Sequence, residues 1–333
     1  MNQKFSLIQK IALSALLVST CTMVDTAMGY VKCAEATQHK STKGKVEGGA
    51  STQANKVDPD KILNSPLIRN SMFLNKYYVE KHTRNKIRAI KIGNSQEKLV
   101  DLRSGDGPRM QHISDIDVKF PKLENQLDYL VRETAFKKLN EMLQYLPDNI
   151  GIAYIAGYRS LAEQKQIVDI MMKKNIGLLK DKYLAYEKTT GDNVMRFIGS
   201  AGGAAGGFVE VNLFKIEKDG SKKLLDMGLL EAERSLRIRN VNDYSLIEIS
   251  DIKGKSVLGP DYTHEQKLNI AMLFEAAVRS GFVVKEVAPW ELMYGGDGWA
   301  FVKDQKSSIY GLCDPADAKL MNMTIDEYLA TFQ

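Results

Sequence analysis

The stretch AGGAAGGFVEVNLFKIEKDGSKKLLD, from Ala201 to Asp226, decides the fold class of this chain. Apolar and polar residues alternate over residues 208–216, which is the period of a β-strand. Lys218-Asp219-Gly220 is a turn sequence, and residues 223–226 supply a second strand. The small residues before Phe208 lead into a strand and include no lysine. They therefore favour close backbone approach over a phosphate-binding loop.

Helical patterns lie on both sides of this predicted hairpin. Apolar residues recur at helical spacing over residues 127–143 before Pro147, and residues 150–156 form an apolar run typical of a buried strand. Ser160 with Glu163 and Thr263 with Gln266 have the spacing of capping boxes. The second box opens a helix that ends near Gly281, where a strand over residues 282–287 follows. Thr324 caps a terminal helix.

This mixture of strands and helices predicts an α+β domain with a small mixed or antiparallel sheet and flanking helices. We expect a signal segment over residues 1–29, a flexible tether over 30–60, an irregular first part of the domain over 61–120 with a strand-like piece at 86–92, and the main domain over 121–333.

The amino terminus has the features of an export signal. Lys4 and Lys10 precede a short apolar run over residues 11–18. Ala27-Met28-Gly29 and Ala34-Glu35-Ala36 both offer a small-x-small cleavage site, and Cys21 is a candidate for lipidation although Thr20 fits a lipobox poorly. Three cysteines cannot build a disulfide framework, and a net charge of +5 does not indicate nucleic-acid binding. We expect an exported protein of the periplasm or cell envelope.

Four separated segments resemble one enzyme family. Gly157-Tyr158-Arg159-Ser160 resembles the GYR element of D-Ala-D-Ala dipeptidases and carboxypeptidases, the VanX and VanY type of zinc peptidase. Residues 201–210 resemble the family's SxHxxGxAxD motif, and Leu225-Asp226-Met227-Gly228 resembles its VDMG element. Residues 281–291 are similar to the closing GF…ExWH motif. The resemblance covers residues 125–302 and implies a fold of the hedgehog and D-Ala-D-Ala peptidase type.

The resemblance carries four family residues onto this chain. Arg159 matches the arginine that stabilises charge on substrate and transition state, and Gly206 matches the motif glycine. Asp226 matches the aspartate that meets the substrate's free amino group, and Trp290 matches the closing tryptophan. The resemblance thus implies Arg159, Asp226 and Trp290 as substrate-binding residues, although Trp290 fits an ordinary core position equally well.

The metal ligands and the base of the family are replaced. Gly203 and Glu291 stand where the two zinc histidines would be, and Glu210 stands in place of the aspartate ligand. Ala288 replaces the general-base glutamate, so no side chain there can take a proton from a metal-bound water. The chain has four histidines, and none falls in these motifs. Glu210 and Glu291 remain metal candidates, for a hard cation such as calcium or magnesium rather than zinc.

We therefore expect a catalytically degenerate homologue that needs no cofactor and binds a peptidoglycan-type peptide or an envelope protein. Two alternatives stay open. One is an active envelope peptidase with a carboxylate-based metal site, and the other is a structural protein whose cleft is filled. We expect no nucleic-acid partner, and membrane contact only through the signal segment or lipidation at Cys21.

Overall fold

The structure is a computed structural model that describes residues 57–160, apart from residues 75, 92, 94, 96, 121, 124 and 125, together with residues 205–228 and 256–311. The chain divides into two units, Met1–Asp58 and Pro59–Gln333, and all the described helices and strands belong to the second. The predicted signal segment, nearly all of the tether, the cap at Ser160–Glu163 and the terminal helix at Thr324 involve residues outside the described part.

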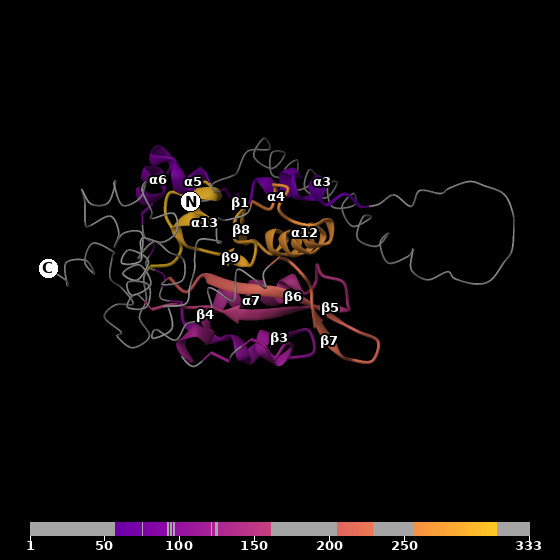
Figure 1. The fold of residues 1–333 in the computed structure, drawn as a ribbon. Helices are drawn as coiled ribbons and strands as arrows, with labels where there is room; N and C mark the ends of the chain where they lie inside the picture. The colour runs from indigo at the N-terminus through magenta and orange to yellow at the C-terminus, as the bar shows by residue number, and fades with distance from the viewer. Residues whose placement is uncertain are drawn as a thin grey trace, which may run out of the picture. The chain divides into compact units, whose positions relative to one another are not determined.

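A mixed sheet of seven strands forms the centre of the domain (Figure 1). Its path runs in the order β1 (Met72–Phe73), β8 (Val283–Lys285), β9 (Glu291–Met293), β6 (Phe208–Ile216), β5 (Ile150–Ala156) and β3 (Met110–His112), while β7 (Lys222–Leu224) pairs with β6. The two outermost pairs, β1–β8 and β3–β5, are parallel and the others are antiparallel. The domain is thus mixed α and β, as the sequence predicts.

The two longest strands have the predicted bounds. β5 is buried along its whole length, and β6 turns through Gly220, which has a φ of +83°, into β7. The predicted capping box is confirmed as well, because α12 (His264–Arg279) begins with reciprocal hydrogen bonds between Thr263 and Gln266. This helix packs against β6 and β8 and against α3 (Pro59–Leu63), α4 (Pro66–Arg69) and α7 (Glu133–Met142).

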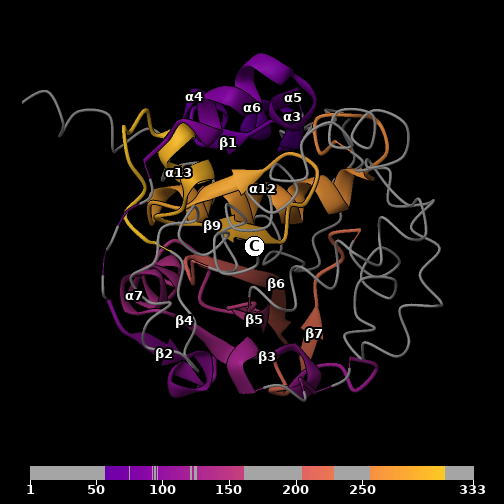
Figure 2. The same cartoon turned by 90° about the vertical axis from the view of Figure 1, so that its left-hand side faces the viewer.

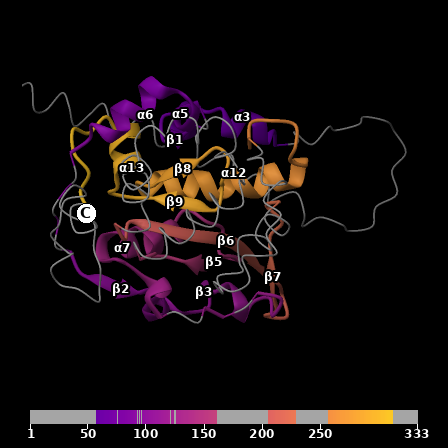
Figure 3. The same cartoon turned by 60° about the vertical axis from the view of Figure 1, so that its left-hand side comes forward.

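At the start of β6, the two faces of the sheet carry different apolar clusters. Val209 belongs to the main core, which also contains the buried apolar residues of α12, whereas its neighbour Phe208 belongs to a smaller cluster with Phe73, Val283 and Met293. The smaller cluster is covered by side chains of α5 (Lys76–Val79), α6 (Lys81–Arg88) and α13 (Asp297–Val302). Figure 2 shows α3, α4, α5 and α6 beyond β1, at the end of the sheet opposite β3, and Figure 3 shows α3, α5 and α6 there from another side.

One prediction from local pattern is wrong in part and a second is wrong. The predicted long helix over residues 127–143 is confirmed over α7, but its first part is a short 3-10 helix, η3 (Gln126–Tyr129), followed by β4 (Leu130–Arg132). The spacing is helical, but residues 130–132 pair with the distant β2 (Leu99–Asp101), and this pairing overrides it. The predicted strand over residues 86–92 begins inside α6, because Ile87 packs into the smaller cluster with Tyr77 and Phe301.

The segment expected to be irregular contributes to both edges of the main sheet. Residues 61–120 supply β1 at one edge and β3 at the other, together with β2 and the 3-10 helices η1 (Leu102–Gly105) and η2 (Ile113–Asp115). Within the described ranges, none of the helices combines the length and apolar character that crossing a membrane requires.

Candidate functional site

Four charged side chains from neighbouring parts of the sheet form a row, which we call the charged row. Glu210 of β6 and Glu291 of β9 are direct cross-strand partners, so their side chains project from the same face. Lys285 ends β8, and its Nζ contacts Glu291 Oε2. On the other side, Arg159 Nη2 lies 3.3 Å from Glu210 Oε1. The signs of charge therefore read plus, minus, minus, plus across the row.

The row lies on the sheet face that carries the smaller apolar cluster. Glu210 is two residues from Phe208 on β6, and Lys285 Nζ is 5.6 Å from the centre of the Phe208 ring. The four side chains are 14% to 25% exposed. They are thus shielded from bulk water but remain accessible, which strengthens interactions among charges and with a ligand.

The row neutralises its own charge. Two carboxylates at directly opposed positions repel each other, unless each has a cation or one takes up a proton. Here Arg159 contacts Glu210 and Lys285 contacts Glu291, so each carboxylate has a basic partner. No group of three histidine, cysteine, aspartate or glutamate side chains suited to holding a metal occurs among the residues that the structure describes.

Backbone contacts fix the position of Arg159. Gly157 N donates to Asp128 O at 2.7 Å, and Tyr158 N donates to Leu130 O at 2.6 Å. A Cβ at Gly157 would lie 2.3 Å from Leu130 O, so this approach requires glycine. The pairing of β5 with β6 also shifts register just before Ala156, which then pairs with Glu210. Such an irregularity changes the direction in which the side chains of a strand point, and it is common beside functional sites.

Close backbone packing positions the start of β6. Gly206 has a φ of +74°, and a Cβ at Gly207 would lie 1.9 Å from Tyr294 O. The fully buried Arg132 holds the preceding turn, because its Nε donates to Ala205 O at 2.9 Å and its backbone N to Gly206 O at 2.8 Å. Close approach is therefore the role of these glycines, as predicted, and Gly203 lies outside the described residues.

Asp226 and Trp290, the other two predicted substrate-binding residues, make contacts with residues outside the charged row. Asp226 follows β7, and its carboxylate accepts hydrogen bonds from Gly228 N at 2.8 Å and from Gln266 Nε2 at 3.1 Å. These contacts tie the end of the hairpin to the first turn of α12. Trp290 is 5% exposed within the main core, and its carbonyl accepts from Val211 N. Ala288 packs against the same core.

The described histidines belong to other parts of the domain. His82 is exposed on α6, and His264 is the first residue of α12. His112 is buried at the end of β3, where it caps η2 by accepting from Ser114 N, as one expects of a capping residue. His112 is also the register partner of Tyr154 on β5.

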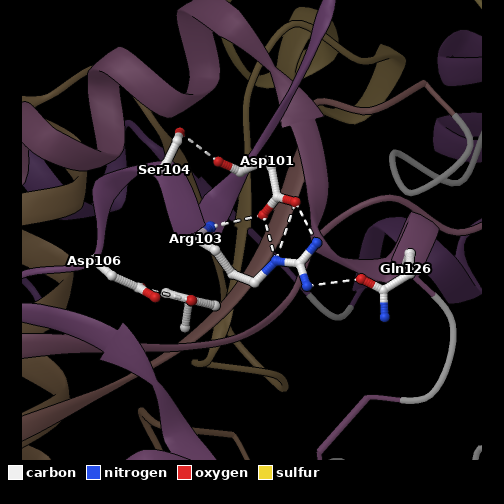
Figure 4. A network of polar contacts seen from close by, with 6 residues as sticks. Asp101, Arg103, Ser104, Asp106 and Gln126 are labelled. Atoms are coloured by element: carbon white, nitrogen blue, oxygen red, sulfur yellow. Dashed lines mark hydrogen bonds and ion pairs between the residues drawn. The ribbon is translucent and has the colours of Figure 1, made fainter.

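A second polar network lies near the β3 edge and was not predicted from the sequence (Figure 4). Arg103 Nε donates to Asp101 Oδ1 at 2.9 Å, and its Nη1 donates to Gln126 Oε1 at 2.7 Å. The Arg103 guanidinium lies 4.3 Å from the centre of the Tyr129 ring. Its hydrogen bonds lower the pKa of the Asp101 carboxyl. This network joins η1 to η3, beside the strand that leads to Arg159.

Lys285 is the member of the charged row that sequence reasoning missed. The available signal was a lysine inside an apolar stretch, Phe282-Val283-Val284-Lys285, of a predicted strand. Its partner could be identified only from the register of β8 with β9. No protein-family model and no curated protein sequence matches this chain.

Proposed function

We propose that the chain is an exported, non-catalytic protein of the D-Ala-D-Ala peptidase type, which binds a short envelope peptide at the charged row. The observation that carries this proposal is the placement of Arg159, Glu210 and Glu291. These residues match three site positions of that family, and they lie together on one face of the sheet. The fold assignment belongs to the proposal, since it rests on the four motifs.

The chemistry of the row supports binding rather than hydrolysis. A metallopeptidase needs neutral or anionic ligands around an open metal position and a base for the attacking water. Ala288 offers no base, and Lys285 brings a positive charge to Glu291. An ammonium group beside a carboxylate competes with a divalent cation for that oxygen.

The same row suits a ligand with a free carboxylate. Arg159 contacts Glu210 through Nη2 at 3.3 Å, which is long for a charge-assisted hydrogen bond of about 2.7–2.9 Å. A peptide carboxylate can therefore compete for the guanidinium, whose planar fork matches its geometry. The Glu210–Glu291 pair lies beside it to receive an amide or ammonium donor. A peptide ending in D-alanine fits the resemblance.

The proposal is tested with a synthetic acyl-D-Ala-D-Ala peptide and the purified protein. Calorimetry should show binding that Arg159→Gln weakens about tenfold to a hundredfold, as loss of a charged contact does. The L-Ala-L-Ala peptide and the Arg103→Gln variant, which leaves the row intact, are the matched controls. No cleavage should follow with or without added zinc. Zinc-dependent cleavage that Glu291→Ala abolishes would establish the peptidase alternative. Absence of binding would support the structural alternative.

A further inference from the structure

Sixteen consecutive residues of this chain carry a strong local excess of positive charge. Residues 76–91 contain six basic residues against one acidic residue, Glu80, a net charge of +5 that equals the formal net charge of the whole chain. The remaining residues therefore balance to zero. The six are Lys76, Lys81, Arg84, Lys86, Arg88 and Lys91.

The fold joins a further lysine to this segment. Lys91 N donates to Lys306 O at 3.2 Å, and Lys91 forms an isolated parallel bridge with Ser307. We call the exposed lysines of these elements the basic face, which consists of Lys76, Lys86, Lys91 and Lys306. Tyr77 and Ile87 anchor α5 and α6 beneath it in the smaller apolar cluster, with the Tyr77 ring 5.1 Å from that of Phe301.

We propose that the basic face binds the anionic surface of a phospholipid bilayer. Its charges are exposed and come from α5, from α6, and from the bridged segments at Lys91 and Lys306, a spread that suits a surface of many headgroups. The chain enters the same layer at α3, directly after the predicted tether, and Figure 2 shows α3, α4, α5 and α6 together beyond β1. Leu67 of α4, 41% exposed, adds an apolar side chain to that layer.

The choice of a membrane over a nucleic acid rests on the predicted export of the chain, which is part of the proposed function. A nucleic acid would satisfy the same charges through its phosphates, so it enters as a competing outcome. Peptide binding at the charged row involves β6, β8, β9 and Arg159, and none of the four lysines of the basic face. A failure of peptide binding would therefore leave the membrane proposal standing.

The test is flotation of the full chain with vesicles of phosphatidylcholine alone, or with about one third phosphatidylglycerol. The ratio of the two affinities removes the apolar contribution of the amino-terminal segment, and comparison with the control variant removes the contribution of its lysines, Lys4 and Lys10. Lys86→Gln/Lys91→Gln/Lys306→Gln should reduce the preference for anionic vesicles about a hundredfold, or roughly fivefold for each lysine. The matched control, Lys119→Gln/Lys218→Gln/Lys223→Gln, removes three exposed lysines from other segments and should change it little.

The preference for anionic vesicles should also fall between about 50 and 300 mM salt, because the headgroup interaction is screened. Equal affinity for the two kinds of vesicle would overturn the proposal, as would an equal loss in the control variant. Tighter binding of single-stranded RNA than of anionic vesicles, removed by the same three substitutions, would also overturn it in favour of a nucleic-acid surface.

Discussion

Lys285 contacts Glu291 on the strand beside its own, and Glu291 in turn stands directly across from Glu210. The lysine is 15% exposed and the glutamate 21% exposed, so neither charge is fully hydrated. Glu210 and Glu291, which the proposed resemblance places at metal-ligand positions, therefore belong to an internally balanced set of charges. This relationship has a measurable consequence for stability.

Replacing Lys285 with methionine should lower the free energy of unfolding by about 2 kcal/mol. This is less than the roughly 3–5 kcal/mol lost when a fully buried pair is broken, because both groups keep some water. Lys285→Met/Glu291→Leu should recover most of the loss, since neither charge is then left without its partner. Lys98→Met, which removes a 69% exposed lysine from Glu133, is the control and should change stability little. Urea denaturation measures all three, and equal effects of the two lysine changes would contradict the assignment.

Gly207→Ala should destabilise the domain by about 2–3 kcal/mol and weaken peptide binding. The added Cβ would lie 1.9 Å from Tyr294 O, so the start of β6 and the residue after β9 must move apart. The Glu210–Glu291 pair follows three positions along the same pair of strands, so its geometry should change as well. Gly107→Ala is the matched control, because its nearest contact would be 3.8 Å away. Thermal unfolding compares the two variants. Similar melting temperatures would show that the close approach is not needed.

Arg103→Ala should make the domain less sensitive to acid. Hydrogen bonding to Arg103 holds the pKa of Asp101 below its ordinary value, so the pair stabilises the fold above that value and the contribution is lost as pH falls through the folded-state pKa. The variant should lose up to about 1 kcal/mol more at pH 7 than in strong acid, since the pair is partly exposed. The part of the loss that remains in strong acid comes from the contacts of Arg103 with Gln126 and Tyr129. A difference that persists unchanged at pH 2 would exclude ionisation as its cause.

Lys303→Met tests a half-buried lysine in the alkaline range. Burial lowers the pKa of Lys303, whose Nζ donates to the Ser71 hydroxyl at 2.7 Å. The unfolded chain therefore holds this proton more tightly, and stability should rise with pH between the folded-state pKa and the ordinary value near 10.5. The methionine variant should lack that rise. Denaturation curves at pH 7 and pH 10 give the free energy of unfolding of both proteins. An equal change of this free energy with pH in the two proteins would contradict the prediction.

Local signals in the sequence predicted the elements that depend on neighbouring residues. The apolar run of β5, the alternation of β6 and the cap at Thr263 are each complete within a few residues. β4 and α6 were misassigned because their conformations depend on distant partners, β2 in one case and Tyr77 and Phe301 in the other.

The candidate site likewise contains residues that local sequence signals identify and residues that depend on distant partners. Arg159, Glu210 and Glu291 could be singled out because motifs mark their positions in the chain. Lys285 belongs to no motif, and only the pairing of β8 with β9 brings it to Glu291. The second network depends in the same way on Gln126 meeting Arg103 across a gap of 23 positions.

The parallel pairing of Met72 with Val284 has a consequence for how the chain matures. The outermost strand is made early, but its partner emerges more than two hundred residues later, so loop closure of this size must precede the pairing. During synthesis from the amino terminus, β1 leaves the ribosome long before β8 does. That edge should be among the last parts to assemble, and a chain cut short before β8 should stay sensitive to proteases.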